Sequence, residues 1–140
     1  MNVPAAARRV WAVVPAAGHG RRFDSRNFDS APKQYAPLLG ATVLEWSLRS
    51  LLAEPRIHGI VVVLAADDAH WTAISATLNS PRLQTAIGGA NRQDSVMNGL
   101  SHLEERAAPE DWVLVHDAAR PCLTARDLGA LLDEMPFLTP

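Results

Sequence analysis

The sequence predicts an α/β fold, a three-layer α/β/α sandwich built around a mainly parallel sheet. Four apolar runs rich in β-branched residues alternate with segments of helical periodicity, which is typical of parallel strands joined by crossover helices. None of these runs alternates regularly between apolar and polar residues, as expected for strands covered on both faces. The predicted order is therefore strand and helix in alternation, four times over.

The predicted elements follow from local sequence signals. The strands cover Val10–Val14, Ile57–Leu64, Leu83–Ile87 and Trp112–Val115. Thr42 and Glu45 have the spacing of a capping box at the start of the first helix. Asn91 and Thr124 are each followed three residues later by an aspartate, which favours a helix start. A fourth helix is predicted near Asp67–Leu78.

Length and composition are those of one domain, residues 1–140. The chain has 140 residues, of which 48% are hydrophobic, and this is enough to bury a core. Its formal net charge is -2 and its basic residues are scattered, so no broad basic surface for nucleic acid or an anionic membrane is predicted. No apolar run reaches the length of a transmembrane helix.

The cysteine content indicates the compartment. Cys122 is the only cysteine of the sequence, so it cannot form an internal disulfide. No group of cysteine and histidine residues has the spacing of a zinc site. Both observations predict a reducing compartment, and the cytoplasm is the expected location.

The C-terminal end of the sequence lacks an expected strand. The last helix ends before Pro136 and no strand pattern follows it. The strand at 112–115 would therefore have no neighbour on one side. We interpret the fold as incomplete at its C-terminal end.

The residues that follow the predicted strands are candidates for a ligand site. In parallel α/β sheets, ligands bind where the strands end, at their carboxyl edge. The first strand is followed by Pro15–Arg22, the third by Gly88–Arg92 and the fourth by His116–Arg120. We expect these three loops to face one crevice.

The first of these loops contains Gly18 and Gly20. Glycine permits positive φ and close approach, so successive N–H groups can point at phosphate oxygens. The dinucleotide fingerprint does not fit, because Phe23 occupies the place of its third glycine. The P-loop does not fit either, because no Gly-Lys-Ser/Thr follows at the required distance. A phosphate-binding loop and a simple tight turn both remain open at this point.

Three cations follow the glycine-containing loop. Arg21, Arg22 and Lys33 would repel one another unless an anion or solvent separates them, and a triphosphate can supply that anion. Arg22 and Lys33 are therefore the candidates for phosphate binding. The alternative is a positive face exposed to solvent.

Asp117 lies at the end of the fourth strand, between His116 and two alanines. A carboxylate there can ligate Mg²⁺, because Mg²⁺ needs only one or two protein carboxylates when phosphates supply the remaining oxygens. The alternative role of Asp117 is to cap the following turn. Arg120 can bind a second phosphate through its planar guanidinium, whereas His116 is expected to be structural.

No side chain has the setting of a nucleophile with its base. Ser47, Ser95 and Cys122 lack a G-x-S-x-G or similar context. Phosphoryl and nucleotidyl transfer need no such group, because there the protein mainly positions the reactants and stabilises charge. The sequence therefore suits that kind of transfer.

Five segments resemble one family, in the same order along the chain. They are PAAGHGRRF, PKQY, TVLEWSLRSLL, GGANRQDSV and WVLVHDAARP, and the match runs from Val10 to about Leu132. Together they resemble the amino-terminal part of the 2-C-methyl-D-erythritol 4-phosphate cytidylyltransferase family. The resemblance implies a Rossmann-like nucleotidyltransferase fold. It also implies transfer of CMP from CTP to methylerythritol phosphate, with Mg²⁺ and with release of pyrophosphate, in non-mevalonate isoprenoid synthesis.

The resemblance assigns roles to individual residues. Arg22 and Lys33 would be catalytic and would stabilise the charged α-phosphate in the transition state. Asp117 would bind the metal and the substrate, and Arg120 would bind the methylerythritol phosphate. The residues implied to bind the nucleotide are Pro15, Ala16, Ala17, Gly18, Gly20, Gly89, Arg92 and Ser95.

The sequence departs from the family pattern in two ways. The polar segment Asp24–Ala31 has no periodicity and predicts a mobile loop, and the loop between Arg22 and Pro32 that contains it is longer than expected for the family. Family members also continue past the end of this chain, with a dimerisation arm and further residues that grip the methylerythritol phosphate. We therefore expect the chain as given to bind CTP but to turn over poorly or not at all. A homodimer is expected of the full-length protein.

Two alternative functions stay open from the sequence. A ribitol-5-phosphate cytidylyltransferase shares these amino-terminal motifs, and the residues that separate the two enzymes lie mostly outside them. A catalytically impaired CTP-binding fragment would bind nucleotide through the same loops.

Overall fold

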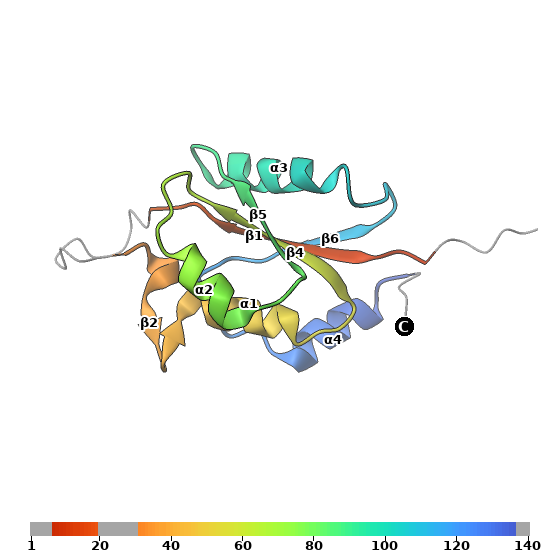
Figure 1. Cartoon of the computed structure of the whole chain (residues 1–140). Coiled ribbons are helices and arrows are strands. Elements are labelled where there is room, and N and C mark those ends of the chain that lie inside the picture. The colour runs from red at the N-terminus through yellow and green to blue at the C-terminus, as the bar shows by residue number, and fades with distance from the viewer. Residues whose placement is uncertain (1–6, 20–30, 137–140) are drawn as a thin grey trace, which may run out of the picture.

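The computed structural model describes residues 7–19 and 31–136. Four parallel strands form its main sheet: β1 (Val10–Ala16), β4 (Ile57–Leu64), β5 (Leu83–Ile87) and β6 (Trp112–Val115). Their order across the sheet is β5-β4-β1-β6 (Figure 1). The predicted strands and the predicted parallel sheet are confirmed, with β1 extending to Ala16. Gly20, Arg21, Arg22 and all but the last residue of the predicted mobile loop lie outside the described residues.

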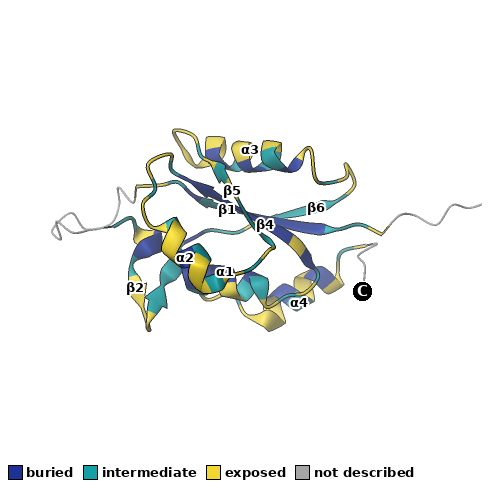
Figure 2. Ribbon diagram, in the orientation of Figure 1, coloured by how far each residue is buried: buried dark blue, intermediate teal, exposed yellow. Residues whose placement is uncertain are grey.

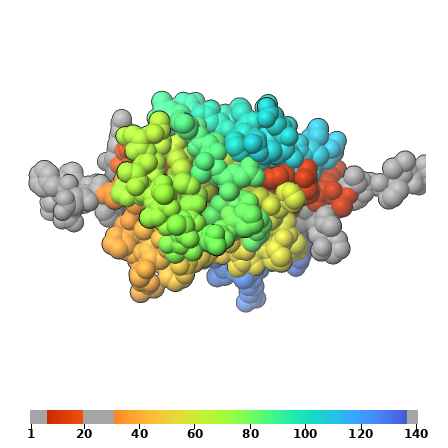
Figure 3. Space-filling view, in the orientation of Figure 1, coloured from red at the N-terminus to blue at the C-terminus, as the bar shows by residue number. Residues whose placement is uncertain are grey.

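Helices cover both faces of the sheet, which confirms the predicted three layers (Figure 1). One face carries α3 (Arg92–Leu103) alone. The other carries α1 (Val43–Leu52), α2 (Trp71–Leu78) and α4 (Ala125–Asp133). In the space-filling view, α2 and the segments next to it cover much of the front of the molecule (Figure 3).

The side chains of β1 divide between two hydrophobic clusters. Trp11 and Val13 pack with Leu103 on the α3 side of the sheet. Val10, Ala12, Val14 and Ala16 belong to the larger cluster, which includes the buried leucines and isoleucines of the other face. This division follows from the pleat of a strand, in which successive side chains point to opposite faces. β1 is therefore the centre of the fold, and its last residue, Ala16, is buried at the carboxyl edge of the sheet.

Burial decreases from the central strands to the outer ones (Figure 2). β1 and β4 are almost wholly buried, whereas Ile87 at the end of β5 is 63% exposed and Val115 at the end of β6 is 44% exposed. The prediction that all four strands are covered on both faces therefore holds only for the central two. Among the described residues β6 pairs with β1 alone, as the sequence indicated for the last strand.

Three predicted helix starts are confirmed by their caps. The side-chain oxygens of Thr42, Asn91 and Thr124 accept the N–H groups of Glu45, Asp94 and Asp127 at 3.2, 2.9 and 3.1 Å. The fourth helix, α2, begins at Trp71 and not near Asp67 as predicted. Asp68 accepts the N–H groups of His70 and Trp71, so its carboxylate satisfies the backbone at the helix start from outside the helix.

A small hairpin between β1 and α1 was not predicted. It pairs β2 (Pro37–Leu38) with β3 (Ala41–Thr42), and a short 3-10 turn, η1 (Lys33–Tyr35), precedes it. Leu39 and Gly40 form the turn with φ of 47° and 82°. Tight hairpins need positive φ at such positions, but leucine rarely adopts it, so the hairpin signal at Leu39 and Gly40 is weak.

The strand order reverses beside β1. The chain adds β4 and then β5 on one side of β1, and α3 then crosses over so that β6 pairs on the other side. Ligands of open α/β sheets bind at such a reversal, outside the carboxyl ends of the strands. The loops after β1 and β6 are therefore the expected walls of a site.

Candidate functional site

The loops after β1 and β5 are in direct contact. A Cβ atom on Gly88 would lie 2.4 Å from the Cβ of Ala17 and 2.7 Å from the Oγ of Ser95. Only glycine fits such a close approach without movement of the backbone. Ala17 and Gly89 were both predicted to bind nucleotide. The contact places the loop that contains Ala17 against the loop that contains Gly89.

Ser95 lies beneath the loop that follows β5. Its side chain is buried, and its hydroxyl accepts the N–H of Gly89 at 3.2 Å. Ser95 therefore fixes the shape of this loop from inside the first turn of α3. The carbonyl of Asn91 in turn accepts the N–H of Ser95 at 3.1 Å.

An ion-pair cluster joins the start of α3 to the loop after β6. Arg92 donates to Oδ1 of Asp117 at 2.7 Å through Nη2 and at 3.1 Å through Nε. Arg120 donates to Oδ2 of the same carboxylate at 2.8 Å. The guanidinium of Arg92, followed by that of Arg120, lowers the pKa of Asp117 against the opposing effect of burial. Three predicted site residues from two loops thus form one cluster, with Asp117 ionised at neutral pH.

In the Asp117 cluster, formed by Arg92, Asp117 and Arg120, the carboxylate is the group that could hold a metal ion arriving with phosphates. In the described ranges 7–19 and 31–136, no group of three or more histidine, cysteine or acidic side chains could hold a metal ion. A single carboxylate at a strand end suits Mg²⁺ when phosphate oxygens complete its coordination. Both oxygens of Asp117 are bonded to guanidinium groups, so an incoming metal would have to replace at least one of those bonds.

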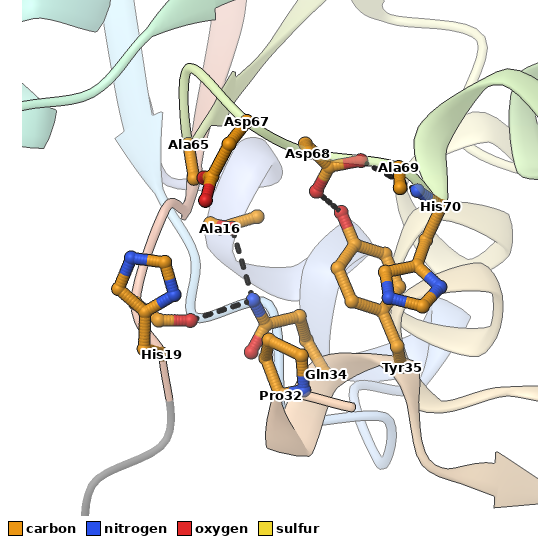
Figure 4. Close-up of a pocket in the computed structure, with 11 residues that line it drawn as sticks. Ala16, His19, Pro32, Gln34, Tyr35, Ala65, Asp67, Asp68, Ala69 and His70 are labelled. Atoms are coloured by element: carbon orange, nitrogen blue, oxygen red, sulfur yellow. Dashed lines mark hydrogen bonds between the residues drawn. The ribbon is translucent and has the colours of Figure 1, made fainter. Parts of the chain in front are cut away.

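The loop after β1 also contacts residues of η1 and of the segment 65–70 that follows β4. There a cavity of about 170 Å³ is lined by Ala16, Gly18, His19, Pro32, Gln34, Tyr35, Ala65, Asp67, Asp68, Ala69 and His70 (Figure 4). Gln34 is buried, and its Nε2 donates to the carbonyl oxygens of Ala16 at 2.9 Å and Gly18 at 3.0 Å. Both amide protons of Gln34 are therefore used on the loop that was predicted to bind phosphate.

The turn η1 is also anchored to the start of α2. The hydroxyl of Tyr35 donates to the carboxylate of Asp68, and the Tyr35 ring lies 4.5 Å from that of His70 (Figure 4). Burial, and then the hydrogen bond to Asp68, raise the pKa of Tyr35, so its phenol stays protonated and remains a donor. The turn is thus held at both ends, by the β1 loop and by α2.

The other residues predicted for the site lie on β1, on η1 and in the loop after β6, or outside the described residues. Pro15 and Ala16 are the last residues of β1, and Lys33 is exposed on η1 beside Gln34. His116 bonds the carbonyl of Arg120 through Nε2 at 2.9 Å, which agrees with its predicted structural role. Gly20 and Arg22 lie outside the described residues, and the structure does not test the roles predicted for them.

Sequence reasoning missed Gln34, Asp67 and Asp68 at this edge of the sheet. A signal was present for the two aspartates, because they follow β4 just as the predicted loops follow the other strands. Gln34 lies in the PKQY segment next to Lys33, but no role was predicted for it. Its contacts depend on how η1 packs against β1, which no local pattern indicates.

The strand order and the loops at the carboxyl edge define the class of protein. It is an α/β domain of the doubly wound type, with the reversal of its strand order next to β1. Comparison with known proteins gives the particular family. The 2-C-methyl-D-erythritol 4-phosphate cytidylyltransferase family matches residues 10–137, and the chain belongs to this family.

Individual relatives agree with this assignment. A 2-C-methyl-D-erythritol 4-phosphate cytidylyltransferase of Halorhodospira halophila is 49% identical over 128 residues, which cover 90% of this chain and 52% of the relative. One of Pseudomonas fluorescens is 50% identical over 126 residues, covering 89% and 52%. The crystal structure of a 4-diphosphocytidyl-2C-methyl-D-erythritol synthase aligns with a TM-score of 0.75 at 31% identity, covering 91% of this chain and 53% of that one. The chain therefore spans about half the length of the relatives it matches.

Proposed function

We propose that this chain binds CTP at the loops after β1, β5 and β6 and transfers CMP to 2-C-methyl-D-erythritol 4-phosphate, with release of pyrophosphate. The observation that carries the proposal is the Arg92–Asp117–Arg120 cluster beside the small-residue loop after β1. It gathers a carboxylate and two guanidinium groups at the strand reversal of a fold whose relatives are named for this transfer. Those names favour methylerythritol phosphate over ribitol 5-phosphate as the acceptor.

The proposed reaction replaces one phosphorus–oxygen bond by another. A phosphate oxygen of the acceptor attacks the α-phosphorus of CTP, and the bond from that phosphorus to the pyrophosphate oxygen breaks. Negative charge develops on the α-phosphate as the attacking oxygen approaches. Lys33 on η1, together with Arg22, is proposed to stabilise that charge, and such preorganised cations are the main contribution a protein makes to this chemistry.

The three residues of the ion-pair cluster are proposed to change partners when substrates bind. Asp117 would hold Mg²⁺, which when bound neutralises part of the phosphate charge. Arg92 and Arg120 then lose their carboxylate partner and can each fork onto a phosphate, Arg92 on the nucleotide and Arg120 on the acceptor. The loop N–H groups near Gly18 would complete the cradle for the nucleotide.

We further propose that the reaction takes place in the cytoplasm and that the full-length protein is a homodimer. The lone Cys122, which is exposed, supports a reducing compartment. In the described residues no helix is long and apolar enough to cross a membrane. The dimer is proposed from the family resemblance alone.

A pyrophosphate-release assay tests the proposed function. The chain is incubated with CTP and Mg²⁺, and with methylerythritol phosphate, with ribitol 5-phosphate or with no acceptor. We expect slow release that depends on methylerythritol phosphate. Equal release with ribitol 5-phosphate would contradict the proposed acceptor. CTP binding without any release would favour the catalytically impaired fragment.

A further inference from the structure

Gln34 is a buried polar side chain that contacts the loop after β1, and it has no role in the proposed reaction. It is 6% exposed, and its Nε2 lies 2.9 Å from the carbonyl oxygen of Ala16 and 3.0 Å from that of Gly18. These two carbonyl groups belong to the residues before and after Ala17. The side chain of Gln34 therefore binds the loop on both sides of Ala17 (Figure 4). A buried amide with both protons bonded is held in one orientation.

Fixing these two carbonyls also fixes two N–H groups. In a trans peptide the C=O and the following N–H lie in one plane and point in opposite directions. The described residues contain no cis peptide bond. The N–H groups of Ala17 and His19 must therefore point away from Gln34. A loop held in this way presents donors on the side opposite Gln34 without reorganisation when an anion arrives.

The same turn that carries Gln34 carries Lys33. Tyr35, the third residue of η1, is 5% exposed and is tied through its hydroxyl to Asp68, which also caps α2 at 2.9 and 2.8 Å. η1 is therefore fixed against α2 at one side and against the β1 loop at the other. Because Lys33 precedes Gln34 in η1, the bonds of Gln34 to the β1 loop also set the position of that loop relative to Lys33.

We propose that Gln34 is a positioning residue for nucleotide binding: it orients the Ala17 and His19 N–H groups toward the triphosphate and sets their position relative to Lys33. This inference rests on the proposed function, because it assumes that the β1 loop binds the triphosphate of CTP. It goes beyond that proposal by assigning the orientation of the loop to one side chain outside the predicted set.

The substitution Gln34→Glu tests the inference. It keeps the size of the side chain but replaces a double donor by a carboxylate that faces two carbonyl oxygens. We expect the Kd for CTP with Mg²⁺, measured by calorimetry, to rise at least tenfold. The matched control is Gln84→Glu, the same change at a partly buried glutamine of β5. Oε1 of Gln84 lies 3.0 Å from Nε2 of His102, to which it is hydrogen-bonded. The control should bind CTP like the unchanged chain.

The thermal midpoint of each variant is measured beside its Kd. A purely structural Gln34 would lower the thermal midpoint and leave the Kd of the folded protein unchanged, and that result would overturn the inference. The same holds if both glutamine variants weaken CTP binding equally. If the unchanged chain does not bind CTP, the proposed function itself fails, which is a different result from a failure confined to Gln34→Glu.

A measurement on the unchanged chain covers the case in which Gln34→Glu does not fold. In a ¹⁵N-labelled sample titrated with CTP and Mg²⁺, we expect the amide resonances of Ala17 and His19 to be among those that shift most. The side-chain amide pair of Gln34 should keep its resonances, because its bonds to the two carbonyls persist. Shifts elsewhere that leave Ala17 and His19 unchanged would overturn the inference.

Discussion

At the scale of single residues, Asp111 is a side chain away from the site that accepts four hydrogen bonds. Its carboxylate accepts the backbone N–H and Nε of Arg9 at 2.9 and 3.2 Å, Nε1 of Trp11 at 2.9 Å and the N–H of Ala108 at 2.9 Å. Its side chain is only 3% exposed. It joins the start of β1 to the loop before β6, and so holds together the two strands at the reversal of the strand order.

We predict that Asp111→Asn lowers the free energy of unfolding by about 3 kcal/mol at pH 7, because it removes a charged acceptor from four donors. Burial acts to raise the pKa of Asp111, but the hydrogen bonds from Trp11, Arg9 and Ala108 outweigh it and lower the pKa. A lowered folded pKa gives stability that is complete above the unfolded pKa of about 3.9 and is lost as the pH falls through the folded value.

Urea denaturation at pH 7 and pH 3 measures this effect. The difference between Asp111→Asn and the unchanged chain should be smaller at pH 3. Glu110→Gln, a similar change at the exposed neighbouring residue, should have little effect at either pH. A difference that stays constant with pH would show that the charge of Asp111 is not what stabilises the fold.

We predict that Asp117→Asn raises about tenfold the Mg²⁺ concentration needed for half-maximal CTP binding. An amide oxygen is a weaker ligand for Mg²⁺ than a carboxylate. Titrations of Mg²⁺ at fixed CTP, followed by calorimetry, give the midpoint. Asp127→Asn, at an exposed residue in the first turn of α4, serves as the control. An unchanged midpoint for Asp117→Asn would remove Asp117 from the proposed metal site.

At the scale of elements, the contact between α3 and the sheet depends on a missing side chain. A Cβ on Gly99 would lie 2.6 Å from Cγ1 of Val13 and 3.0 Å from Cγ2 of Val63, and both valines are fully buried. Gly99 therefore lets α3 approach β1 and β4 closely. That approach positions the first turn of α3, which carries Arg92 and Ser95, against the loops of the site.

The same substitution at two helical glycines should have opposite effects. Gly99→Ala should lower the free energy of unfolding by about 1 to 3 kcal/mol, because α3 must move away from the sheet. Gly129→Ala in α4 should raise it by up to about 1 kcal/mol, since the nearest atom, on the flexible Arg56, would be 3.6 Å away and alanine favours helix. Urea denaturation measures both. Equal destabilisation by the two changes would contradict the packing described for α3.

The elements were largely predictable, because most of their signals are local. Thr42, Asn91 and Thr124 cap helices through bonds to residues three positions away, and the strands are continuous apolar runs. The errors have non-local causes. α2 starts late because Asp68 caps it from outside while also accepting from Tyr35, 33 residues earlier in the sequence. The β2–β3 hairpin forms although Leu39 adopts a φ of 47°.

At the scale of the whole molecule, the strand order turns separate loops into one site. The sequence predicted that the loops after β1, β5 and β6 share an edge, and the contacts of Gly88 with Ala17 and of Arg92 with Asp117 show that they meet. Sequence could not indicate that Asp117 has guanidinium partners on both oxygens, or that Gln34 holds the β1 loop. These contacts arise only when elements far apart in the chain pack together.

The proposed binding of a nucleotide to these loops through its polyphosphate can be measured by calorimetric titration of the chain with CTP and with CMP, each with Mg²⁺. Loop N–H groups, Lys33 and the arginines of the Asp117 cluster are all expected to contact phosphate, and charge-assisted hydrogen bonds to phosphate are strong. We predict that CTP binds at least tenfold more tightly than CMP. Equal affinities for CTP and CMP, or no heat with CTP, would contradict binding of the polyphosphate by these loops.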